Sequence, residues 1–325
     1  MTERPPILQV QNLSVSLPIS GRMVPVVTDL SFSIGPGEAV ALVGESGCGK
    51  SMTARAIIGL PPPGAAVSGS IKLDRRELTA LSPQERRRVG GRGIGFIFQE
   101  PMTSLHPTLS IGQQMMDSLR YNLDLSARAA RDRARELLTR VGLPKDRDLL
   151  NAYVHELSGG MRQRVMIAIA ISCNPKLVIA DEPTTALDVT IQAQVLDLLI
   201  AMRAEIGLAM LYISHDLEVV AEFCDRAVVM YAGDQVEAGT PVECLKAPHH
   251  PYTRGLVDAI PHAGEARARL SPIPGQVPSL GSWPSGCRFQ PRCPQQNDRC
   301  ATRPALTTIA RSEVRCWHPL AGEAS

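Results

Sequence analysis

The sequence contains no apolar run long enough to cross a membrane. Charged residues interrupt the hydrophobic stretches, as Arg203 and Glu205 do within LLIAMRAEIGLAMLYI. The N-terminal stretch MTERPPILQV also has no apolar core of signal-peptide length. These absences predict a cytosolic chain that reaches a membrane only through a partner.

An excess of charge of one sign is also missing. The 34 Lys and Arg residues nearly balance the 32 Asp and Glu residues, and the net charge of +2 argues against a nucleic-acid-binding protein. The chain has 325 residues, with 44% hydrophobic and 20% charged side chains, which fits a folded protein of one large or two modest domains.

Cysteine and proline are unevenly distributed along the chain. Twelve of the 26 prolines lie at or after Pro241. Half of the eight cysteines are scattered, whereas the last 39 residues contain Cys287, Cys293, Cys300 and Cys316. This change of composition predicts a domain boundary near residue 245.

A glycine-rich phosphate-binding motif occupies AVALVGESGCGKS, residues 39–51. It matches G-x-x-x-x-G-K-[ST] completely, between a predicted strand and a predicted helix. Glycines let backbone N–H groups turn toward phosphate oxygens, and the helix start adds its positive dipole end. Lys50 is expected to reach the β- and γ-phosphates and Ser51 to bind Mg²⁺. The predicted ATP-binding residues of the loop are Gly44, Glu45, Ser46, Gly47, Cys48, Gly49, Lys50 and Ser51.

Two adjacent carboxylates follow a short apolar strand in KLVIADEP. Like charges side by side are costly unless they have something to hold, and neighbouring side chains on a strand point to opposite faces. Asp181 therefore suits the Mg²⁺ shell, while Glu182 can face the γ-phosphate and polarise the attacking water. The alternative is a capping acid followed by a surface acid.

A second anion site is predicted at the start of HELSGGMRQRVMIAIAIS. Ser158 is a good helix N-cap, and Gly159 and Gly160 leave the helix N-terminus bare. This site has no lysine of its own. Two phosphate-binding helix starts and one nucleotide loop indicate two chains that share two nucleotides.

Six motifs together resemble those of the ATP-binding subunits of ABC transporters, over essentially the whole chain. GESGCGKS is similar to the Walker A loop, LVIADE to Walker B, LSGGMRQR to the signature, FIFQEP to the Q-loop, TALD to the D-loop and ISHD to the switch. The resemblance implies two ATPase domains that close head to tail, with each ATP between the Walker A loop of one chain and the signature helix of the other.

The resemblance also implies roles for individual residues. Gln99 would contact Mg²⁺ or the water and pass the nucleotide state to the membrane partner, His215 would contact the γ-phosphate, and Asp188 would end the D-loop. The catalytic set is thus Glu182, His215 and Gln99, with Ser51, Gln99 and Asp181 around Mg²⁺. The residues expected to act on the partner's ATP are Ser158, Gly159, Gly160 and Gln163.

One position departs from the family pattern. The first strand usually carries an aromatic residue that stacks on adenine, but NLSVSLPIS offers only Leu17. An aliphatic side chain can pack on the base but loses the ring–ring contribution of roughly 0.5–1.5 kcal/mol. Selectivity for adenine is expected to be correspondingly loose.

The implied fold class is α/β: a P-loop NTPase core of the ABC type, with an antiparallel β subdomain, an inserted helical subdomain and a cysteine-containing C-terminal extension. We expect the ATPase domain at residues 1–245, the helical subdomain at about 100–165 and the extension at 246–325. Helical spacing in SARAARDRARELLTRVGLP, with Ser126 as a cap, supports the helical subdomain.

The tail narrows the resemblance to one branch. APHHPYTRGLVDAIP, PIPGQVPSL and the four tail cysteines resemble the extension of peptide and nickel importers, and SGGMRQRVMIA resembles the dipeptide-type D subunits. The implied function is ATP hydrolysis that powers import of di- or oligopeptides, with nickel or another small solute as the alternative cargo. A non-transport ABC ATPase is a different class, which the single cassette and the roughly sixty residues between Gln99 and Ser158 disfavour.

The implied partners are two transmembrane permease subunits, a second and related ATPase subunit in a heterodimer, and an extracytoplasmic solute-binding protein. The implied location is peripheral, at the cytoplasmic face of the inner membrane. No nucleic-acid partner is expected.

The four tail cysteines are separated by five, six and fifteen residues. A cytosolic chain disfavours disulfides, so the thiolates could hold zinc or an iron–sulfur cluster. Zinc ligands usually come in closer pairs, and the resemblance to peptide-importer tails also points to a 4Fe–4S cluster, which we favour over zinc. The remaining alternative is four reduced core thiols.

Overall fold

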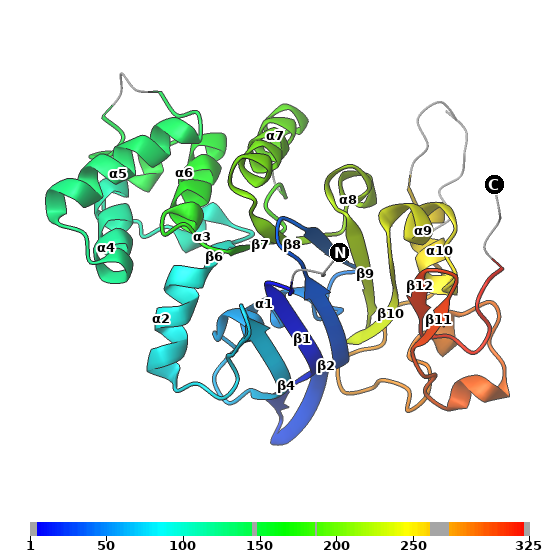
Figure 1. The fold of residues 1–325 in the computed structure, drawn as a ribbon. Coiled ribbons are helices and arrows are strands. Elements are labelled where there is room, and N and C mark those ends of the chain that lie inside the picture. The colour runs from blue at the N-terminus through cyan, green and yellow to red at the C-terminus, as the bar shows by residue number, and fades with distance from the viewer. Residues whose placement is uncertain (1–4, 145–147, 186, 261–272, 322–325) are drawn as a thin grey trace. The chain divides into compact units, whose positions relative to one another are not determined.

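The structure is a computed structural model that describes residues 5–144, 148–185, 187–260 and 273–321 (Figure 1). The chain divides into two compact units. The first unit comprises residues 1–8, 34–38 and 73–212, and the second unit comprises residues 9–33, 39–72 and 213–325. Each unit is described by itself.

The second unit contains a mixed sheet with the strand order β11-β12-β10-β9-β3. β3 (Ala39–Val43) pairs in parallel with β9 (Arg226–Tyr231), with Val43 opposite Val229. Every residue of β3 is buried, as expected for a short apolar strand covered on both faces. The sheet therefore gives a rigid support to the loop that follows β3.

The C-terminal extension adds strands to this sheet. β9 and β10 (Asp234–Gly239) form an antiparallel hairpin, and β12 (Ser312–Val314) pairs antiparallel with β10. β11 (Thr307–Ile309) pairs in turn with β12. The sequence reasoning missed β11 and β12 because three residues are too few to show a strand period.

A separate sheet carries the expected β subdomain, with the order β2-β1-β4. Its strands are β1 (Leu8–Ile19), β2 (Arg22–Ile34) and β4 (Ala66–Leu73). Leu13 and Val15 of β1 are fully buried, whereas Gln11 and Asn12 are exposed. The strands thus present one apolar face to the core and one polar face to solvent.

The first unit contains the strand order β8-β7-β6. β6 (Ile94–Ile97) and β7 (Leu177–Asp181) are parallel, with Ile94 opposite Leu177 and Ile97 opposite Ala180. β8 (Ala209–Ser214) is buried along its whole length. The short strand β5 (Arg76–Glu77) precedes the helices of this unit.

The helices of the first unit include the predicted inserted group, drawn in green in Figure 1. α5 carries the predicted cap, because the Ser126 hydroxyl accepts the Ala129 N–H, and its Leu137 and Leu138 are buried. Met115 of α4 is also fully buried, so it packs in the core. The helices are α2 (Pro83–Gly93), α3 (Pro101–Ser104), α4 (Ile111–Leu123), α5 (Ala127–Arg140), α6 (Gly159–Ile171) and α7 (Val189–Ile206).

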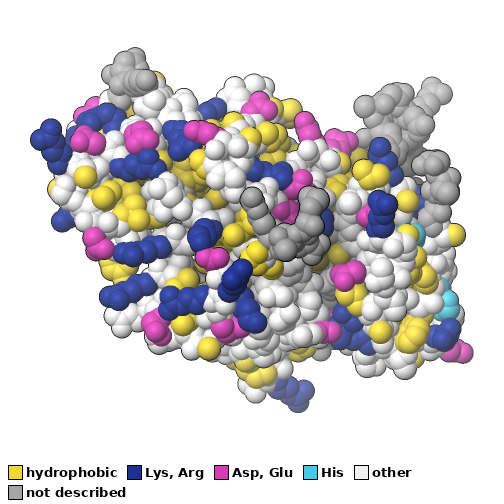
Figure 2. Space-filling view, viewed as in Figure 1, with side chains coloured by type: hydrophobic (Ala, Val, Ile, Leu, Met, Phe, Trp, Pro, Cys, Tyr) yellow, Lys and Arg dark blue, Asp and Glu magenta, His cyan; other side chains and the backbone are white. Residues whose placement is uncertain are grey.

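The helices of the second unit are short. They are α1 (Lys50–Ile58), α8 (Leu217–Phe223), α9 (Pro241–Lys246), α10 (Pro251–Asp258) and the 3-10 turns η2 (Gln290–Arg292) and η3 (Asp298–Ala301). Within the described ranges, no helix is long and apolar enough to span a bilayer. Basic and acidic side chains are interspersed on the face drawn in Figure 2, in keeping with the small net charge.

Candidate nucleotide site and four-cysteine pocket

The phosphate-binding loop connects β3 to α1, the strand–loop–helix context that the motif requires. Gly44 has φ of 149°, and a Cβ there would lie 2.2 Å from the carbonyl oxygen of Met230. Gly49 has φ of 104° and would place a Cβ 2.9 Å from the Val26 carbonyl oxygen. Larger residues are therefore excluded at both positions by the backbone conformation and by neighbouring backbone.

Lys50 holds its ammonium inside the loop. The residue is 5% exposed, and its Nζ donates to the carbonyl oxygens of Gly44 at 2.6 Å and Glu45 at 3.1 Å. Burial raises the pKa of the neighbouring Cys48 thiol, although the charge of Lys50 opposes this shift. The loop thus presents one fixed positive charge beside a neutral thiol, which suits binding of polyanionic phosphates.

Two residues of the C-terminal extension contact Glu45, which the sequence motif assigned to ATP. Arg292 donates to both carboxylate oxygens of Glu45, at 2.7 and 3.1 Å. The Tyr252 hydroxyl accepts the Glu45 N–H at 2.8 Å. More than two hundred residues separate these partners along the chain, so sequence reasoning had no signal for them.

Asp181 and Glu182 lie at the end of β7 in the first unit. Asp181 is the last strand residue and is buried, whereas Glu182 has a φ of 47°, a left-handed conformation that non-glycine residues rarely adopt. The alternation of strand side chains therefore does not extend to Glu182. The turn, not the pleat, sets the direction of its carboxylate.

Gln99 and Glu182 meet although 83 residues separate them. Nε2 of Gln99 donates to Oε2 of Glu182 at 3.1 Å, and the Thr185 hydroxyl donates to the same oxygen at 3.0 Å. Two of the three predicted catalytic residues are thus adjacent within one unit. A carboxylate held by two donors has a defined orientation, as a group that activates water requires.

The signature segment begins α6 as predicted. The Ser158 hydroxyl accepts the Met161 N–H at 3.3 Å, which makes it the N-cap. A Cβ on Gly160 would lie 3.0 Å from the side chain of Ile191, whereas one on Gly159 would meet no atom within 4 Å. Gly160 is therefore needed for close packing, while Gly159 leaves space in front of the helix N-terminus.

Gln163 and Asp188 have contacts within their own chain. Gln163 is 1% exposed, and its Nε2 donates to the Pro183 carbonyl oxygen at 2.5 Å, directly after Glu182. Asp188 caps α7 by accepting the Ile191 N–H at 2.9 Å. The described contacts of Gln163 thus connect the signature helix to the turn that carries Glu182; its contact with the partner's ATP stays a prediction.

The remaining predicted nucleotide residues lie in the second unit. His215 is exposed at the end of β8 and precedes Asp216, which caps α8. Leu17 is half-buried on β1. Ser51 is in the first turn of α1, in the second unit, and Asp181 is in the first unit. Their joint coordination of Mg²⁺ stays a prediction.

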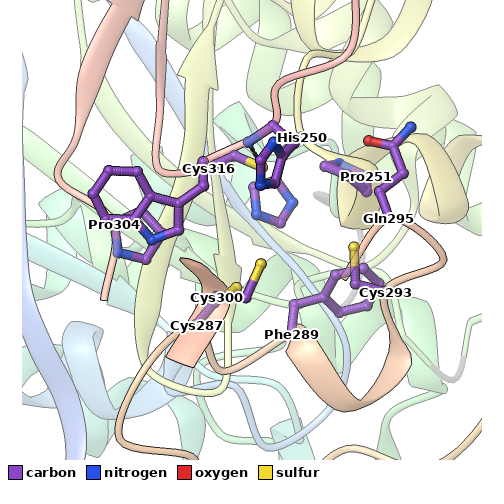
Figure 3. A pocket seen from close by; sticks show the side chains of 11 residues that line it. His250, Pro251, Cys287, Phe289, Cys293, Gln295, Cys300, Pro304 and Cys316 are labelled. Carbon is purple, nitrogen blue, oxygen red and sulfur yellow. Dashed lines mark hydrogen bonds between the residues drawn. The ribbon is translucent and has the colours of Figure 1, made fainter. Parts of the chain in front are cut away.

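The four tail cysteines line one pocket, together with His250 and Phe289 (Figure 3). Cys300 is buried and the other three are half-buried. The backbone brings two of them together, because the Cys287 N–H donates to the Cys300 carbonyl oxygen at 2.9 Å. Sequence positions spread over thirty residues thus converge on one place in the fold.

Burial favours the neutral forms of two side chains that line the pocket. It raises the pKa of the Cys287 thiol to about 11 and lowers the pKa of His250 to about 3. Nδ1 of the neutral His250 accepts the Tyr252 N–H at 3.0 Å. Among the described residues, no three His, Cys, Asp or Glu side chains converge closely enough to hold a single metal ion.

Comparison with known proteins places these features in one family. Residues 27–185 match the family described as ABC transporter, and residues 236–300 match the family described as oligopeptide/dipeptide transporter, C-terminal region. The chain is 47% identical over 315 residues to the oligopeptide transport ATP-binding protein AppD of Bacillus subtilis, covering 96% of each chain. It is 44% identical over 317 residues to the dipeptide transport ATP-binding protein DppD of Escherichia coli, covering 97% of each.

Solved structures agree on the fold. The ATP-binding cassette MJ0796, solved as a dimer bound to ADP and Pi, is 27% identical, with a TM-score of 0.65 over 72% of this chain and 98% of the other. The cbiO1 protein of Clostridium perfringens gives a TM-score of 0.62 at 29% identity, over 74% and 90% of the two chains. The chain belongs to the ATP-binding subunits of the oligopeptide and dipeptide ABC transporters.

Proposed function

We propose that this chain binds and hydrolyses ATP between its phosphate loop and the signature helix of a second ATPase, and that this powers peptide import. Family membership supports the reaction, ATP hydrolysis coupled to transport. The observation that carries the residue assignment is the Glu182 carboxylate, held by Gln99 and Thr185 where β7 ends. The test is the Glu182 substitution described in the Discussion.

The residues divide the work between phosphate binding and water activation. Lys50 would neutralise the phosphates, and Ser51, Asp181 and Gln99 would supply oxygen ligands to Mg²⁺. Glu182 polarises the attacking water, and His215 holds the γ-phosphate in the attack geometry. The buried position of Lys50 and the two-donor support of Glu182 favour these roles.

The signature helix is proposed to act on the ATP of the other subunit. Its capped N-terminus has an open approach at Gly159, and backbone N–H groups at such an end attract phosphate. The relative MJ0796 was solved as a dimer. A dimer interface built on Ser158, Gly159 and Gly160 predicts that bulk in this segment blocks association.

We expect Ser158→Arg to abolish ATP-dependent dimerisation while the isolated chain still binds ATP, because the longer cationic side chain occupies the phosphate position. The Ser158→Arg change is made in the Glu182→Gln chain, and sedimentation with and without ATP measures the fraction of dimer. Ser126→Arg is the matched control, since Ser126 is also a helix N-cap, on α5. ATP-dependent dimers of the Ser158→Arg chain would contradict the shared site.

We propose peptides as the cargo and a heterodimeric transporter as the assembly. The C-terminal match and the printed functions of the AppD and DppD relatives support a peptide importer with two permeases, a second related ATPase and a solute-binding protein. The chain would then lie at the cytoplasmic face of the inner membrane. Peptide uptake by vesicles that contain the permeases tests this, and activity without a second ATPase would favour a homodimer.

Residues 246–325 are proposed as the extension of an ATPase domain spanning residues 1–245. The separate matches at 27–185 and 236–300 support two parts of the sequence. In three dimensions, the extension is integrated with the phosphate loop and the β3 sheet in one compact unit. Its role is therefore proposed to be structural support of the nucleotide site.

The four-cysteine pocket is proposed to hold a 4Fe–4S cluster. In such a cluster each cysteine binds a different iron, so the sulfurs surround a larger object than one zinc ion. The convergence of four cysteines on one pocket is the observation that supports this proposal. Reduced thiols remain the alternative, because burial favours the neutral form of Cys287, Cys293 and Cys316.

Chain purified without oxygen is expected to contain about four irons, as the proposed 4Fe–4S stoichiometry requires. Cys300→Ser should lose the iron and destabilise the tail, because Cys300 is buried in the pocket wall. Cys224→Ser is the control, since Cys224 is buried in the same unit outside the pocket. One zinc and no iron per chain would contradict the cluster and indicate a mononuclear zinc site. Protein without iron or zinc would contradict both metal sites and indicate four reduced thiols.

A further inference from the structure

Arg292 is a buried cation whose three guanidinium nitrogens all donate hydrogen bonds to protein acceptors. Its side chain is 4% exposed, and it pairs with Glu45 through both carboxylate oxygens. Nε donates to the Pro274 carbonyl oxygen at 3.0 Å and Nη2 to the Ile273 carbonyl oxygen at 3.2 Å. The guanidinium also lies 5.7 Å from the centroid of the Tyr231 ring. Loss of Glu45 is costly, because Arg292 would be left as a buried, unpaired charge, whereas the Glu45 side chain is 29% exposed.

Glu45 is held at three points, and only one belongs to the phosphate loop. Its carbonyl oxygen accepts from Lys50 Nζ and from the Cys48 N–H of the loop, its N–H donates to the Tyr252 hydroxyl, and its carboxylate pairs with Arg292. Tyr252 is fully buried on α10. The extension therefore holds two of these three groups, the N–H and the carboxylate of the second loop residue.

Arg292 and Tyr252, which make these two contacts, are both next to residues that line the four-cysteine pocket. Arg292 directly precedes Cys293, which lines the pocket. Tyr252 follows His250 and Pro251, which also line it, and its ring packs on Phe289 of the pocket wall with centroids 5.4 Å apart. A change of this wall is thus transmitted to Glu45 through one ion pair and one hydrogen bond.

We propose that Arg292 and Tyr252 are positioning residues of the phosphate loop, and that they couple nucleotide binding to the integrity of the four-cysteine pocket. The inference rests on the proposed ATP-binding function of that loop. Neither residue touches the nucleotide in this scheme; both orient the backbone of Glu45 so that the loop is preorganised for phosphate. Because such coupling is reciprocal, bound ATP must also stabilise the pocket wall.

The test measures ATP affinity by equilibrium titration of purified, full-length chain. Arg292→Gln is expected to weaken ATP binding by about 5- to 50-fold, the range of couplings through charged contacts. Tyr252→Phe, which removes only the hydroxyl, should weaken it by a smaller factor in the same direction. Arg292→Lys should recover part of the affinity, because it keeps the charge but not the two-point pairing.

Two comparisons separate positioning from general stability. Arg303→Gln breaks another tail pair, with Asp234 at 2.8 Å, and should leave ATP affinity unchanged. Glu45→Gln combined with Arg292→Gln should bind ATP no more weakly than the worse single variant, because both remove the same interaction. Additive losses, or equal losses in Arg292→Gln and Arg303→Gln, would overturn the proposal.

Hydrogen exchange of the wild-type chain gives a readout that needs no substitution. Bound ATP is expected to slow exchange in residues 287–300, and unchanged exchange there would overturn the coupling. If the wild-type chain binds no ATP, the proposed function itself fails. If it binds ATP while Arg292→Gln and Tyr252→Phe bind equally well, only the positioning inference fails.

Discussion

Glu182→Gln is expected to reduce ATP turnover by about 100- to 10,000-fold while leaving ATP binding intact, because the amide keeps the shape but cannot act as a base. Its carbonyl oxygen can still accept from Gln99 and Thr185, which donate to Oε2 of Glu182. The local geometry is therefore preserved and only the chemistry is removed. The variant should also accumulate the closed dimer with ATP bound. Phosphate release by the assembled complex measures the effect.

The matched control is Glu205→Gln, a surface acid on α7 whose side chain is 62% exposed and pairs with Arg140. Such an exposed pair contributes little to stability, so turnover should be unchanged. To prevent the second ATPase from carrying the flux, the corresponding acid of that subunit must be substituted as well. Near-normal turnover of the complex with both acids replaced would remove Glu182 from the catalytic role.

Lys50→Ala is expected to weaken ATP binding on the order of 10- to 100-fold, because a charge-assisted contact to the phosphates is lost. The structure sharpens this expectation. The Lys50 ammonium is buried and bridges the carbonyl oxygens of Gly44 and Glu45, so its removal also releases the loop backbone. Equilibrium titration with ATP, in the presence of Mg²⁺, measures the change.

Lys246→Ala is the control for Lys50→Ala, because Lys246 is an exposed lysine on α9 of the same unit. It carries the same change in charge and should not alter ATP affinity. If Lys50→Ala bound ATP as tightly as this control, the loop would not be the phosphate site. Adding Arg292→Gln to Lys50→Ala then tests whether these two contacts to Glu45 act together.

The phosphate loop and signature were accessible from sequence because their physics is local. Gly44 and Gly49 are required by backbone conformations within a few residues, and Ser158 caps the helix that directly follows it. The membership of the family follows from the same motifs and their order. Local rules of this kind predict which residues bind phosphate, and they also predicted the caps of α5 and α6.

Contacts across long separations were decided only by the tertiary structure. The strand alternation used for Asp181 and Glu182 ends at Asp181, and the left-handed turn at Glu182 directs its carboxylate instead. The contact of Gln99 with Glu182 and the burial of Gln163 against Pro183 depend on the packing of α6 and β6 beside β7. No periodicity in the sequence reports such packing.

The tail shows the same division most clearly. Sequence alone determined that four cysteines and many prolines gather after residue 245, and hence that the chain carries an extension. That Arg292 and Tyr252 of this extension hold Glu45 was decided by folding, which brings residues more than two hundred positions apart into contact. An ion pair depends on the position of both partners in space, and spacing along the chain does not report that position.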